Sequence, residues 1–595
     1  MKYTHNPLRY RRRETREVRV GNVGIGGNNP IRVQSMITCD TMDTEMSIQQ
    51  TIELAEVGCE IVRITAPTVK DSRNLENIVK GLRERGCNVP IVADIHFKPE
   101  AAMEAAKWVD KVRINPGNYA DSKKFVIREY TDEQYAGELN RIRERFTPLV
   151  DLCKERGIAL RIGTNHGSLS DRILNRYGDT PLGMVESALE FARIARDHDY
   201  HAFVFSMKAS NPKIMIAAYR LLVARLNELG PDWNYPVHLG VTEAGEGEDA
   251  RIKSAIGIGS LLADGIGDTI RVSLTEDSPH EIPVARALVA MATKAGETPA
   301  AAGQDVDLSF DPFSYQRRTT ETIERDGVRM GGEELIRVVV PKTNYDKIAH
   351  KIDKMGDYKP EIVYENANIV EIDPRDENAI ARLNQSATAQ FVTVKDDVDL
   401  AVIARYRLLA AKLHARHPIL LKDCELRNAD WGKDFQERLL LASTNIGSLL
   451  CDGIGDAVLV QGEEAPGQAL RLSYNILQGA GSRIFKTDYV ACPSCGRTLF
   501  NLQTTTAKIK AATLHLKGVK IAIMGCIVNG PGEMADADFG YVGGAPGKVN
   551  LYVGKTAVKF NIPETEAVDR LQDLIREHGK WVEPASAVSS LEVVS

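Results

Sequence analysis

EIVRITAPTVKDSRNLENIVKGLRERGCNVPIVADIHF, residues 60–97, has the pattern of a strand, a helix and a second strand. The runs EIVRIT and PIVADIHF are rich in β-branched residues, which favour strands. Between them, LENIVKGLRERG places apolar residues at helical spacing and ends in glycine, as helices often do. This stretch therefore predicts one strand-helix unit of a parallel α/β fold.

The same unit recurs through most of the N-terminal half of the chain. Eight β-rich runs are separated by segments with helical periodicity, such as MSIQQTIELAEVG and PKIMIAAYRLLVARLNELG. Eight strand-helix units predict an α/β fold, a TIM (β/α)8 barrel, whose active site lies at the C-terminal ends of the strands. The eight runs are NPIRVQSM (29–36), EIVRIT (60–65), PIVADIHF (90–97), KVRINPG (111–117), ALRIGTNHG (159–167), AFVFSMK (202–208), PVHLGVTEAG (236–245) and DTIRVSL (268–274).

Polar residues end most of the predicted barrel strands. Five of them are cations that would repel one another without an anion, so we expect a phosphorylated or diphosphorylated small substrate. A structural network with Asp94 and Glu243 is the alternative, and the two can coexist. Glu243 is also a candidate general acid or base, and Asp94 and His96 are candidates to orient substrate hydroxyls. The residues are Arg63 and Thr65, Asp94 and His96, Arg113 and Asn115, Arg161 and Asn165, Ser206 and Lys208, Glu243, and Arg271 and Ser273.

A repeat extends the fold beyond the first barrel. IGSLLADGIGD at 258–268 returns as IGSLLCDGIGD at 446–456, and YRLLVARL at 219–226 returns as YRLLAAKL at 406–413. The nearly equal offsets predict a duplicated set of strand-helix units, and hence a barrel-like middle region. DTIRVSL is matched by DAVLVQG, which replaces Arg271 and Ser273 with Leu459 and Gln461. We therefore expect the copy to have lost most of its polar mouth and to be structural.

Three cysteines near the C-terminus form a candidate metal centre. Cys492 and Cys495 lie in CPSC, and Cys526 lies on a Gly-Pro-rich loop, GCIVNGPGE. His515 and Glu533 are candidate fourth ligands. An iron-sulfur cluster, a structural zinc site and a redox dithiol all fit this spacing. Three thiolates and a weaker carboxylate would leave one iron with a displaceable ligand, which suits reductive chemistry on a hydroxyl.

Composition excludes several classes of protein. The 595 residues carry a net charge of -6, which provides no general basic surface for nucleic acid. No apolar run is long enough to cross a bilayer, and the N-terminus lacks the apolar core of a secretory signal, so we expect a cytoplasmic protein with no membrane partner. Nine cysteines, an odd number, argue against a disulfide framework.

Several segments together resemble one known family. They are VADIHF, VRINPGN, RIGTNHGSL, FSMKAS, HLGVTEAGE, IGSLLADGIGDTIRVSL, ACPSCGRTLF and MGCIVNGPGE. In these segments the chain resembles the IspG or GcpE family, the 4-hydroxy-3-methylbut-2-enyl diphosphate synthases of the methylerythritol phosphate route to isoprenoids. Residues 300–483 resemble the insert of the larger, three-domain members.

The resemblance implies a complete set of site residues. A C-terminal α+β domain would hold a 4Fe-4S cluster, and the barrel would bind 2-C-methyl-D-erythritol 2,4-cyclodiphosphate. Glu243 would have an acid or proton-donor role. The implied cluster ligands are Cys492, Cys495, Cys526 and Glu533, the implied diphosphate contacts are Arg63, Arg113, Arg161, Lys208, Arg271 and Ser273, and the other implied substrate contacts are Asp94, His96 and Asn165.

The resemblance also implies the reaction and its partners. The substrate's ring would be opened and a hydroxyl removed with two electrons from ferredoxin or flavodoxin, giving 4-hydroxy-3-methylbut-2-enyl diphosphate. The expected domains are a barrel at 1–295, a barrel-like structural insert at 305–483 and a cluster domain at 484–595 that closes over the barrel mouth. We expect a monomer as the catalytic unit. The main alternative is a phosphate-binding barrel hydrolase or lyase with a structural zinc site.

Overall fold

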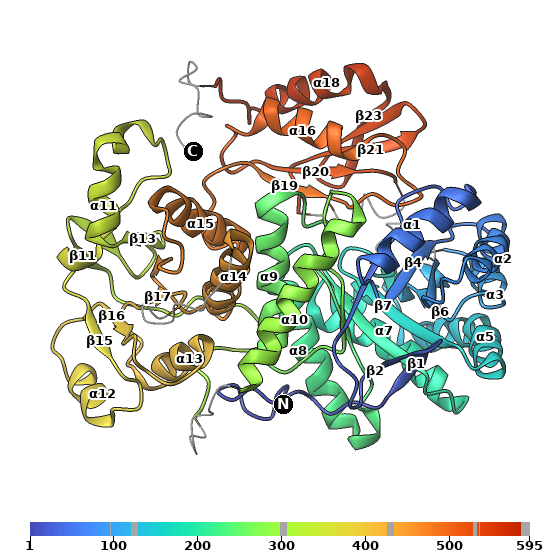
Figure 1. Ribbon diagram of the computed structural model, residues 1–595, viewed down its shortest axis with the longest axis horizontal. Coiled ribbons are helices and arrows are strands. Elements are labelled where there is room, and N and C mark those ends of the chain that lie inside the picture. The colour runs from blue at the N-terminus through green and yellow to red at the C-terminus, as the bar shows by residue number, and fades with distance from the viewer. Residues whose placement is uncertain are drawn as a thin grey trace.

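The computed structural model describes residues 1–95, 97–120, 129–297, 306–424, 434–527, 532, 534 and 536–584. We call residues 1–297 the barrel, residues 306–483 the insert and residues 484–584 the C-terminal unit. In Figure 1 the insert lies beside the barrel, and the C-terminal unit lies across the top of both. None of the helices in these ranges is both long enough and apolar enough to span a bilayer.

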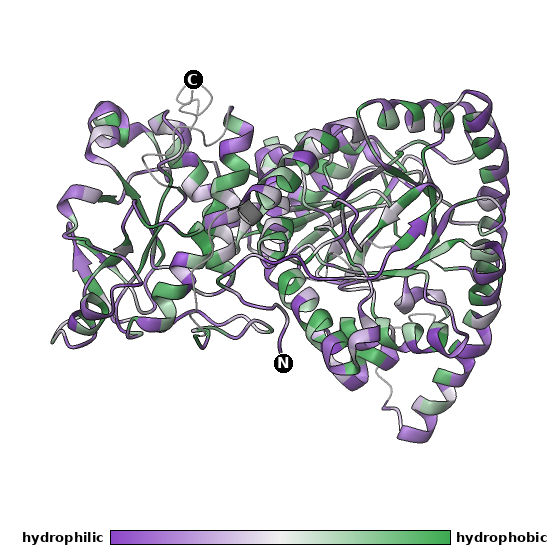
Figure 2. Ribbon diagram, turned by 60° about the horizontal axis from the view of Figure 1, so that its bottom comes forward, coloured by the Kyte–Doolittle hydropathy of each residue, from purple (hydrophilic) through white to green (hydrophobic). Residues whose placement is uncertain are grey.

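The barrel consists of eight parallel strands with helices outside, as the sequence predicts. Its strands follow the order β8-β7-β6-β5-β4-β3-β10-β9, and a parallel bridge between Phe205 and Val237 closes the ring. Figure 2 shows apolar strands inside and polar outer helix faces. An antiparallel hairpin, β1 (Val18–Val20) and β2 (Val23–Ile25), precedes the barrel strands. These strands are β3 (Arg32–Met36), β4 (Ile61–Thr65), β5 (Ile91–Ile95), β6 (Lys111–Ile114), β7 (Ala159–Asn165), β8 (Phe203–Lys208), β9 (His238–Leu239) and β10 (Thr269–Ile270).

The barrel helices begin at good capping residues. Thr68 and Thr131 each form a capping box with the side chain three residues later, which satisfies free N–H groups of the first turn. Asp43, Ser170 and Asn211 cap three other helices through side-chain oxygen atoms. The helices are α1 (Thr44–Glu56), α2 (Val69–Glu84), α3 (Pro99–Ala105), α4 (Pro116–Tyr119), α5 (Asp132–Arg156), α6 (Asp171–Tyr177), α7 (Pro181–Asp197), α8 (Pro212–Leu229), α9 (Gly247–Ala263) and α10 (Glu281–Glu297).

The insert is barrel-like but open. Strand pairs and a bridge between Val392 and Ile419 give the parallel order β15-β16-β17-β18-β13-β14, and no pairing between β14 and β15 is present among the described residues. A hairpin of β11 (Ile323–Arg325) and β12 (Val328–Met330) precedes these strands. The other elements are β13 (Arg337–Val340), α11 (Lys342–Ile348), β14 (Ile362–Val363), β15 (Val370–Ile372), α12 (Glu377–Asn384), β16 (Val392–Val394), α13 (Val402–Lys412), β17 (Leu420–Lys422), α14 (Phe435–Cys451), β18 (Ala457–Leu459) and α15 (Pro466–Gly479).

The duplication includes the N-terminal hairpin as well as the repeat found in the sequence. Gly26 and Gly331, both with positive φ, follow the two hairpins 305 positions apart, and each packs against a threonine hydroxyl, Thr15 or Thr320. The repeat later in the chain has an offset of only 188. The copy is therefore 117 residues shorter between these points, which explains why six strands stand where the barrel has eight.

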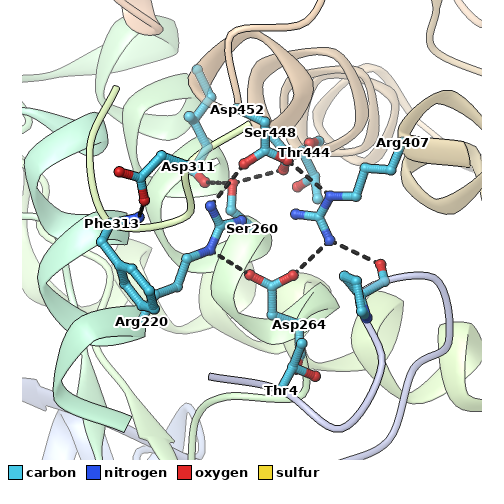
Figure 3. A network of polar contacts seen from close by, with 12 residues as sticks. Thr4, Arg220, Ser260, Asp264, Asp311, Phe313, Arg407, Thr444, Ser448 and Asp452 are labelled. Atoms are coloured by element: carbon cyan, nitrogen blue, oxygen red, sulfur yellow. Dashed lines mark hydrogen bonds and ion pairs between the residues drawn. The ribbon is translucent and has the colours of Figure 1, made fainter. Parts of the chain in front are cut away.

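The barrel and the insert meet along a symmetrical seam. Arg220 donates through Nε to Asp264 and through Nη1 to Asp452, both at 2.8 Å. Arg407, its equivalent in the repeat, donates through Nε to Asp452 at 2.8 Å and through Nη1 to Asp264 at 2.7 Å. All four side chains are buried, and Figure 3 shows that they form a closed ring. One apolar core runs through both units around this ring.

The C-terminal unit has a hydrophobic core of its own. Its sheet has the order β19-β20-β21-β22-β23, with the first three strands parallel and the last two antiparallel. Two helices pack on it around apolar residues that are separate from the core of the barrel. The elements are β19 (Asp488–Ala491), α16 (Leu502–Thr513), β20 (Lys520–Met524), β21 (Phe539–Ala545), β22 (Lys548–Val553), β23 (Thr556–Pro563) and α18 (Glu564–Glu577).

Candidate active site

The three cysteines lie at one end of the C-terminal sheet. β19 and β20 are parallel neighbours in register, with Ala491 opposite Ile523, so Cys492 and Cys526 leave the sheet at the same edge. The backbone N–H of Gly525 donates to the Cys492 sulfur at 3.2 Å. Burial and the neighbouring Cys495 raise the pKa of the Cys492 thiol well above its usual value. A cation or metal centre bound here would stabilise the thiolate forms, which burial and the closeness of the cysteines disfavour.

One row of side chains crosses the barrel at its C-terminal half. Asp94, Arg113 and Arg161 are paired in register across β5, β6 and β7. Arg113 donates to Asp94 Oδ1 at 2.8 Å and to Asn165 Oδ1 at 3.0 Å, so its guanidinium is fixed in orientation. The Asp94 part of the polar network that the sequence allows as an alternative is therefore present, whereas Glu243 forms no ion pair with a described residue.

The remaining cations surround this row. Arg271 donates to both oxygens of Glu281 at 2.9 and 3.1 Å, and Arg63 lies 3.6 Å from Asp94. Burial lowers the pKa of Arg63 to about 10, even though the Asp94 carboxylate opposes this shift. Burial and nearby arginines lower the pKa of Lys208 well below its usual range. The mouth is therefore a site with excess positive charge, and an anion bound there would be strongly favoured.

Two cations lie deeper in the barrel. Arg161 and Lys111 are fully buried, and none of the three guanidinium nitrogens of Arg161, nor the Lys111 amine, makes a hydrogen bond to a described residue. Burial is the first cause that lowers the pKa of each, and other cations lower it further. Arg161 does not line the pocket at the mouth, so it contributes positive charge from beneath.

Glu243 is held in a strained position. Its backbone has φ of 49°, in the left-handed region that non-glycine residues avoid at a cost on the order of 1 kcal/mol. The side chain is 6% exposed, and Oε2 makes no hydrogen bond to a described residue. Such strain is common at functional sites, where the fold fixes a side chain at one point. An acid or base role for Glu243 fits this geometry.

The C-terminal unit closes over the barrel mouth. The loop after β9 pairs with β19 through a bridge between Ala244 and Ala491, and Thr275 donates to the Cys492 carbonyl at 3.2 Å. Lys253 of α9 pairs with Asp488 at 2.8 Å. One pocket is lined from both sides, by Met36, Arg63, Asp94, Arg113, Asn165, Lys208, Thr242, Glu243, Arg271, Ser273, Cys492, Pro493, Cys495, Arg497, Met524 and Cys526. The two sets of residues that the sequence indicates separately thus meet in this pocket.

The candidate ligand His515 lies outside the pocket, with its Nε2 2.9 Å from the Val582 carbonyl oxygen. Three of the residues implied by the resemblance are also not in this description of the pocket. His96 and Glu533 lie outside the described residues. Arg161 lies beneath the pocket, as described above. Sequence reasoning missed Arg497, which lines the pocket two residues after Cys495. A basic residue inside a cysteine loop is the signal that would have indicated it.

The insert has a polar mouth of its own, contrary to the expectation that most of it is lost. Lys422 and Gln461 both donate to Asp396 Oδ1, at 2.7 and 3.2 Å. The backbone N–H of Gln461 donates to Asp423 at 2.8 Å. These polar groups form hydrogen bonds with one another. Leu459 and Gln461, which stand where the barrel has Arg271 and Ser273, add no positive charge. This mouth is a closed network rather than a second cationic site.

The thiols suit an iron-sulfur cluster as donors. Among the described residues, no group of three or more His, Cys, Asp or Glu side chains is arranged to hold a single metal ion. The candidate ligand Glu533 is not one of these residues. A cluster takes its thiolates from a wider frame than one ion does, because its own irons and sulfides fill the space between them. Three cysteine sulfurs at one pocket wall are compatible with that frame.

Comparison with known proteins identifies the family. A family model described as the GcpE TIM-barrel domain matches residues 15–286, and one described as the GcpE protein C-terminal domain matches residues 488–577. The chain belongs to the GcpE family. This family member is 59% identical to a protein of Akkermansia muciniphila named 4-hydroxy-3-methylbut-2-en-1-yl diphosphate synthase (flavodoxin), over 98% of this chain and 99% of the relative.

Relatives from other lineages span the insert as well. A flavodoxin-type synthase of Leptospira interrogans is 44% identical over 98% of this chain and 99% of its own length. A chloroplastic synthase (ferredoxin) of Arabidopsis thaliana is 43% identical over 98% of this chain and 90% of its own length. The family and the TIM-barrel fold predicted from the sequence are confirmed. The comparisons do not support the alternative, a phosphate-binding barrel hydrolase or lyase with a structural zinc site.

Proposed function

We propose that this enzyme converts 2-C-methyl-D-erythritol 2,4-cyclodiphosphate to 4-hydroxy-3-methylbut-2-enyl diphosphate. The reaction opens the cyclic diphosphate and removes one hydroxyl, consuming two electrons and one proton and releasing one water. A single observation carries the proposal: one pocket is lined by the cations of the barrel and by the three cysteines of the C-terminal unit. A diphosphate and a reducing centre can therefore act on the same small molecule.

Cys492, Cys495, Cys526 and Glu533 are proposed to hold a 4Fe-4S cluster. When bound, the cluster would supply electrons at the pocket wall. Cys492, Cys495 and Cys526 line the same pocket as the barrel cations, which supports the assignment. Glu533 is proposed from the motif that it shares with the family.

The barrel residues are proposed to bind and orient the substrate. Arg63, Arg113, Lys208 and Arg271, with Arg161 beneath them, would hold the diphosphate, and Ser273 would add a hydroxyl donor. Asp94 and Asn165 hold Arg113 in one orientation, and with His96 they would contact the rest of the substrate. Glu243, whose Oε2 lies in the pocket wall without a described partner, would deliver the proton that the reaction consumes.

The partners follow from the reaction. A two-electron reduction needs a donor, and we propose flavodoxin or ferredoxin, which the relatives' names give as theirs. Barrel and C-terminal unit of one chain form the pocket together, which supports a monomer as the catalytic unit. We also propose that the division at 1–295, 305–483 and 484–595 is one of domains, with the insert structural, and that the enzyme is cytoplasmic.

One experiment tests this function directly. The protein is purified without oxygen and analysed for iron, sulfide and zinc, and it is then given the cyclodiphosphate with a reduced flavodoxin. We expect about four irons and four sulfides per chain, broad visible absorption, and the open-chain diphosphate by phosphorus NMR. A colourless protein with one zinc, from cells that support cluster assembly, would contradict the proposal and revive the hydrolase or lyase.

A further inference from the structure

Arg497 carries a positive charge from the C-terminal unit into the barrel mouth. It lies two residues after Cys495 and lines the pocket together with four barrel cations, Arg63, Arg113, Lys208 and Arg271. The neighbouring Gly496 packs directly on the barrel, because a Cβ there would lie only 2.6 Å from the Cys39 carbonyl oxygen. The Cys-Gly-Arg segment at 495–497 is thus the point at which the C-terminal unit enters the barrel.

The guanidinium of Arg497 is only partly satisfied by the protein. The Cys495 side chain lies close enough to interact with it. Its Nε and Nη1 atoms are buried and make no hydrogen bond to any described residue. A guanidinium keeps its positive charge throughout the ordinary pH range. Two donors on a charged, buried group are therefore free for a ligand.

The surrounding charges indicate what that ligand is. The pocket lining contains five cationic side chains but only two carboxylates, Asp94 and Glu243. Asp94 already accepts from Arg113, and Arg63 is near enough to Arg497 for the two charges to repel. Closing the C-terminal unit without an anion thus adds a cation to a site that already has too many. An anion with several oxygens removes this cost.

We propose that Arg497 binds an oxygen of the substrate's diphosphate and so makes closure of the C-terminal unit depend on bound substrate. The assignment rests on the proposed function for the identity of the substrate. Its chemistry, a buried guanidinium presenting two N–H donors to a polyanion, is independent of the reaction. Arg497 is the anion ligand that the C-terminal side of the pocket supplies, whereas the barrel supplies the others.

The test uses holoprotein purified without oxygen and two probes, the cyclodiphosphate and inorganic pyrophosphate. Arg497→Gln removes the charge, Arg497→Lys keeps it, and Arg570→Gln on α18, an exposed arginine, is the control. We expect the affinity of Arg497→Gln for both probes to fall about tenfold or more, with Arg497→Lys in between and the control unchanged. The visible spectrum should stay that of the wild type. Affinity within about twofold of the wild type, or loss of the cluster in Arg497→Gln, would overturn the proposal and leave Arg497 a support of Cys495.

A second arm asks whether Arg497 acts only in the closed form. Gly496→Ala is expected to hold the C-terminal unit, and Arg497 with it, away from the barrel without changing the Arg497 side chain itself. In that background, Arg497→Gln should weaken pyrophosphate binding no further, so the two changes should be strongly non-additive. Full additivity would overturn the link to closure. A wild type that binds pyrophosphate but never converts the cyclodiphosphate would defeat the proposed function alone, and the pyrophosphate comparison would still decide the role of Arg497.

Discussion

Ser260 and Ser448 face each other across the seam between the barrel and the insert, with their hydroxyl oxygens 2.7 Å apart. They are the same residue of the repeated IGSLL motif, 188 positions apart. Equivalent residues touch each other only where a local two-fold axis passes between them. The ring of Arg220, Asp264, Arg407 and Asp452 in Figure 3 lies around the same axis, so two copies of one surface are joined within a single chain.

The ring predicts a large effect of removing one arginine. Arg220→Ala leaves Asp264 and Asp452 buried with less compensation, and we expect a loss of about 3–5 kcal/mol in the free energy of unfolding. Chemical denaturation measures this loss. Arg225→Ala on the same helix α8 removes only a surface pair with Glu228 and should cost less than about 1 kcal/mol. Equal losses in the free energy of unfolding would show that the buried ring contributes no more to stability than the surface pair does.

The ring also predicts how stability depends on pH. Burial raises the pKa of Asp264, but Arg220 and Arg407 outweigh burial and lower it below its ordinary value. Its contribution is therefore complete above the unfolded pKa of about 3.9 and is lost as pH falls through the lower, folded value. Thermal unfolding of Asp264→Asn should lie well below that of the wild type at pH 7. The gap should narrow only below about pH 4, and a gap that closes between pH 5 and 7 would contradict this account.

Gly496→Ala should uncouple the two halves of the active site. The added methyl group would meet the Cys39 backbone, which cannot rotate away, and the Thr65 hydroxyl at 2.9 Å. We expect turnover to fall by at least about tenfold while iron content and the melting temperature of the barrel stay unchanged. Gly137→Ala, in an exposed turn of α5 with open space around it, is the matched control and should be fully active. Normal turnover in Gly496→Ala would show that closure tolerates a side chain here.

Lys208 should take up a proton when the diphosphate binds. Burial and nearby arginines lower its pKa well below the usual range, so as pH rises its amine loses the proton earlier than an ordinary lysine does. A bound anion favours the charged form, so binding takes up protons and affinity decreases as pH rises. Calorimetry in buffers of different ionisation enthalpy counts these protons. The count should fall in Lys208→Gln, and the same count in both proteins would assign the uptake to another group.

Cys526→Ser should remove or damage the cluster. Serine oxygen is a poorer iron ligand than thiolate, so iron, sulfide and visible absorption should all drop in protein purified without oxygen. Cys87→Ser is the matched control, because Cys87 is also half-buried but lies far along the chain, in the barrel. Wild-type iron content in Cys526→Ser would remove this residue from the proposed ligand set.

The sequence predicted the barrel well, for a physical reason. Each strand-helix unit buries its own apolar pattern, so EIVRIT and PIVADIHF could be recognised without knowledge of the rest. The duplication was visible because the seam needs the same residues on both sides, as at Arg220 and Arg407. The hairpin part of the copy was missed, although GG and IRV recur at 26–33 and 331–338. There the intervening residues differ, since only the turn glycines and the strand are constrained.

The site was harder to predict because it joins distant segments. Periodicity gave Arg113 and Asp94 as strand ends, but their pairing depends on the register between β5 and β6. The position of Arg497 inside a cysteine loop marks it as a candidate, but its place in the pocket depends on where the C-terminal unit contacts the barrel. Likewise, the strain at Glu243 is set by the backbone of a loop and leaves no mark in composition.

The two sides of the symmetrical seam belong to one chain, so a substitution can change one side without changing the other. In an assembly of two identical chains, every substitution appears twice, so a residue kept for one copy is kept in both. Here the two copies are encoded separately, and each can drift. The insert has retained the seam motif in ten of eleven positions, yet it has lost 117 residues and exchanged Arg271 and Ser273 for Leu459 and Gln461. Because the two copies are encoded separately, the insert could lose residues and polar side chains that the barrel has kept.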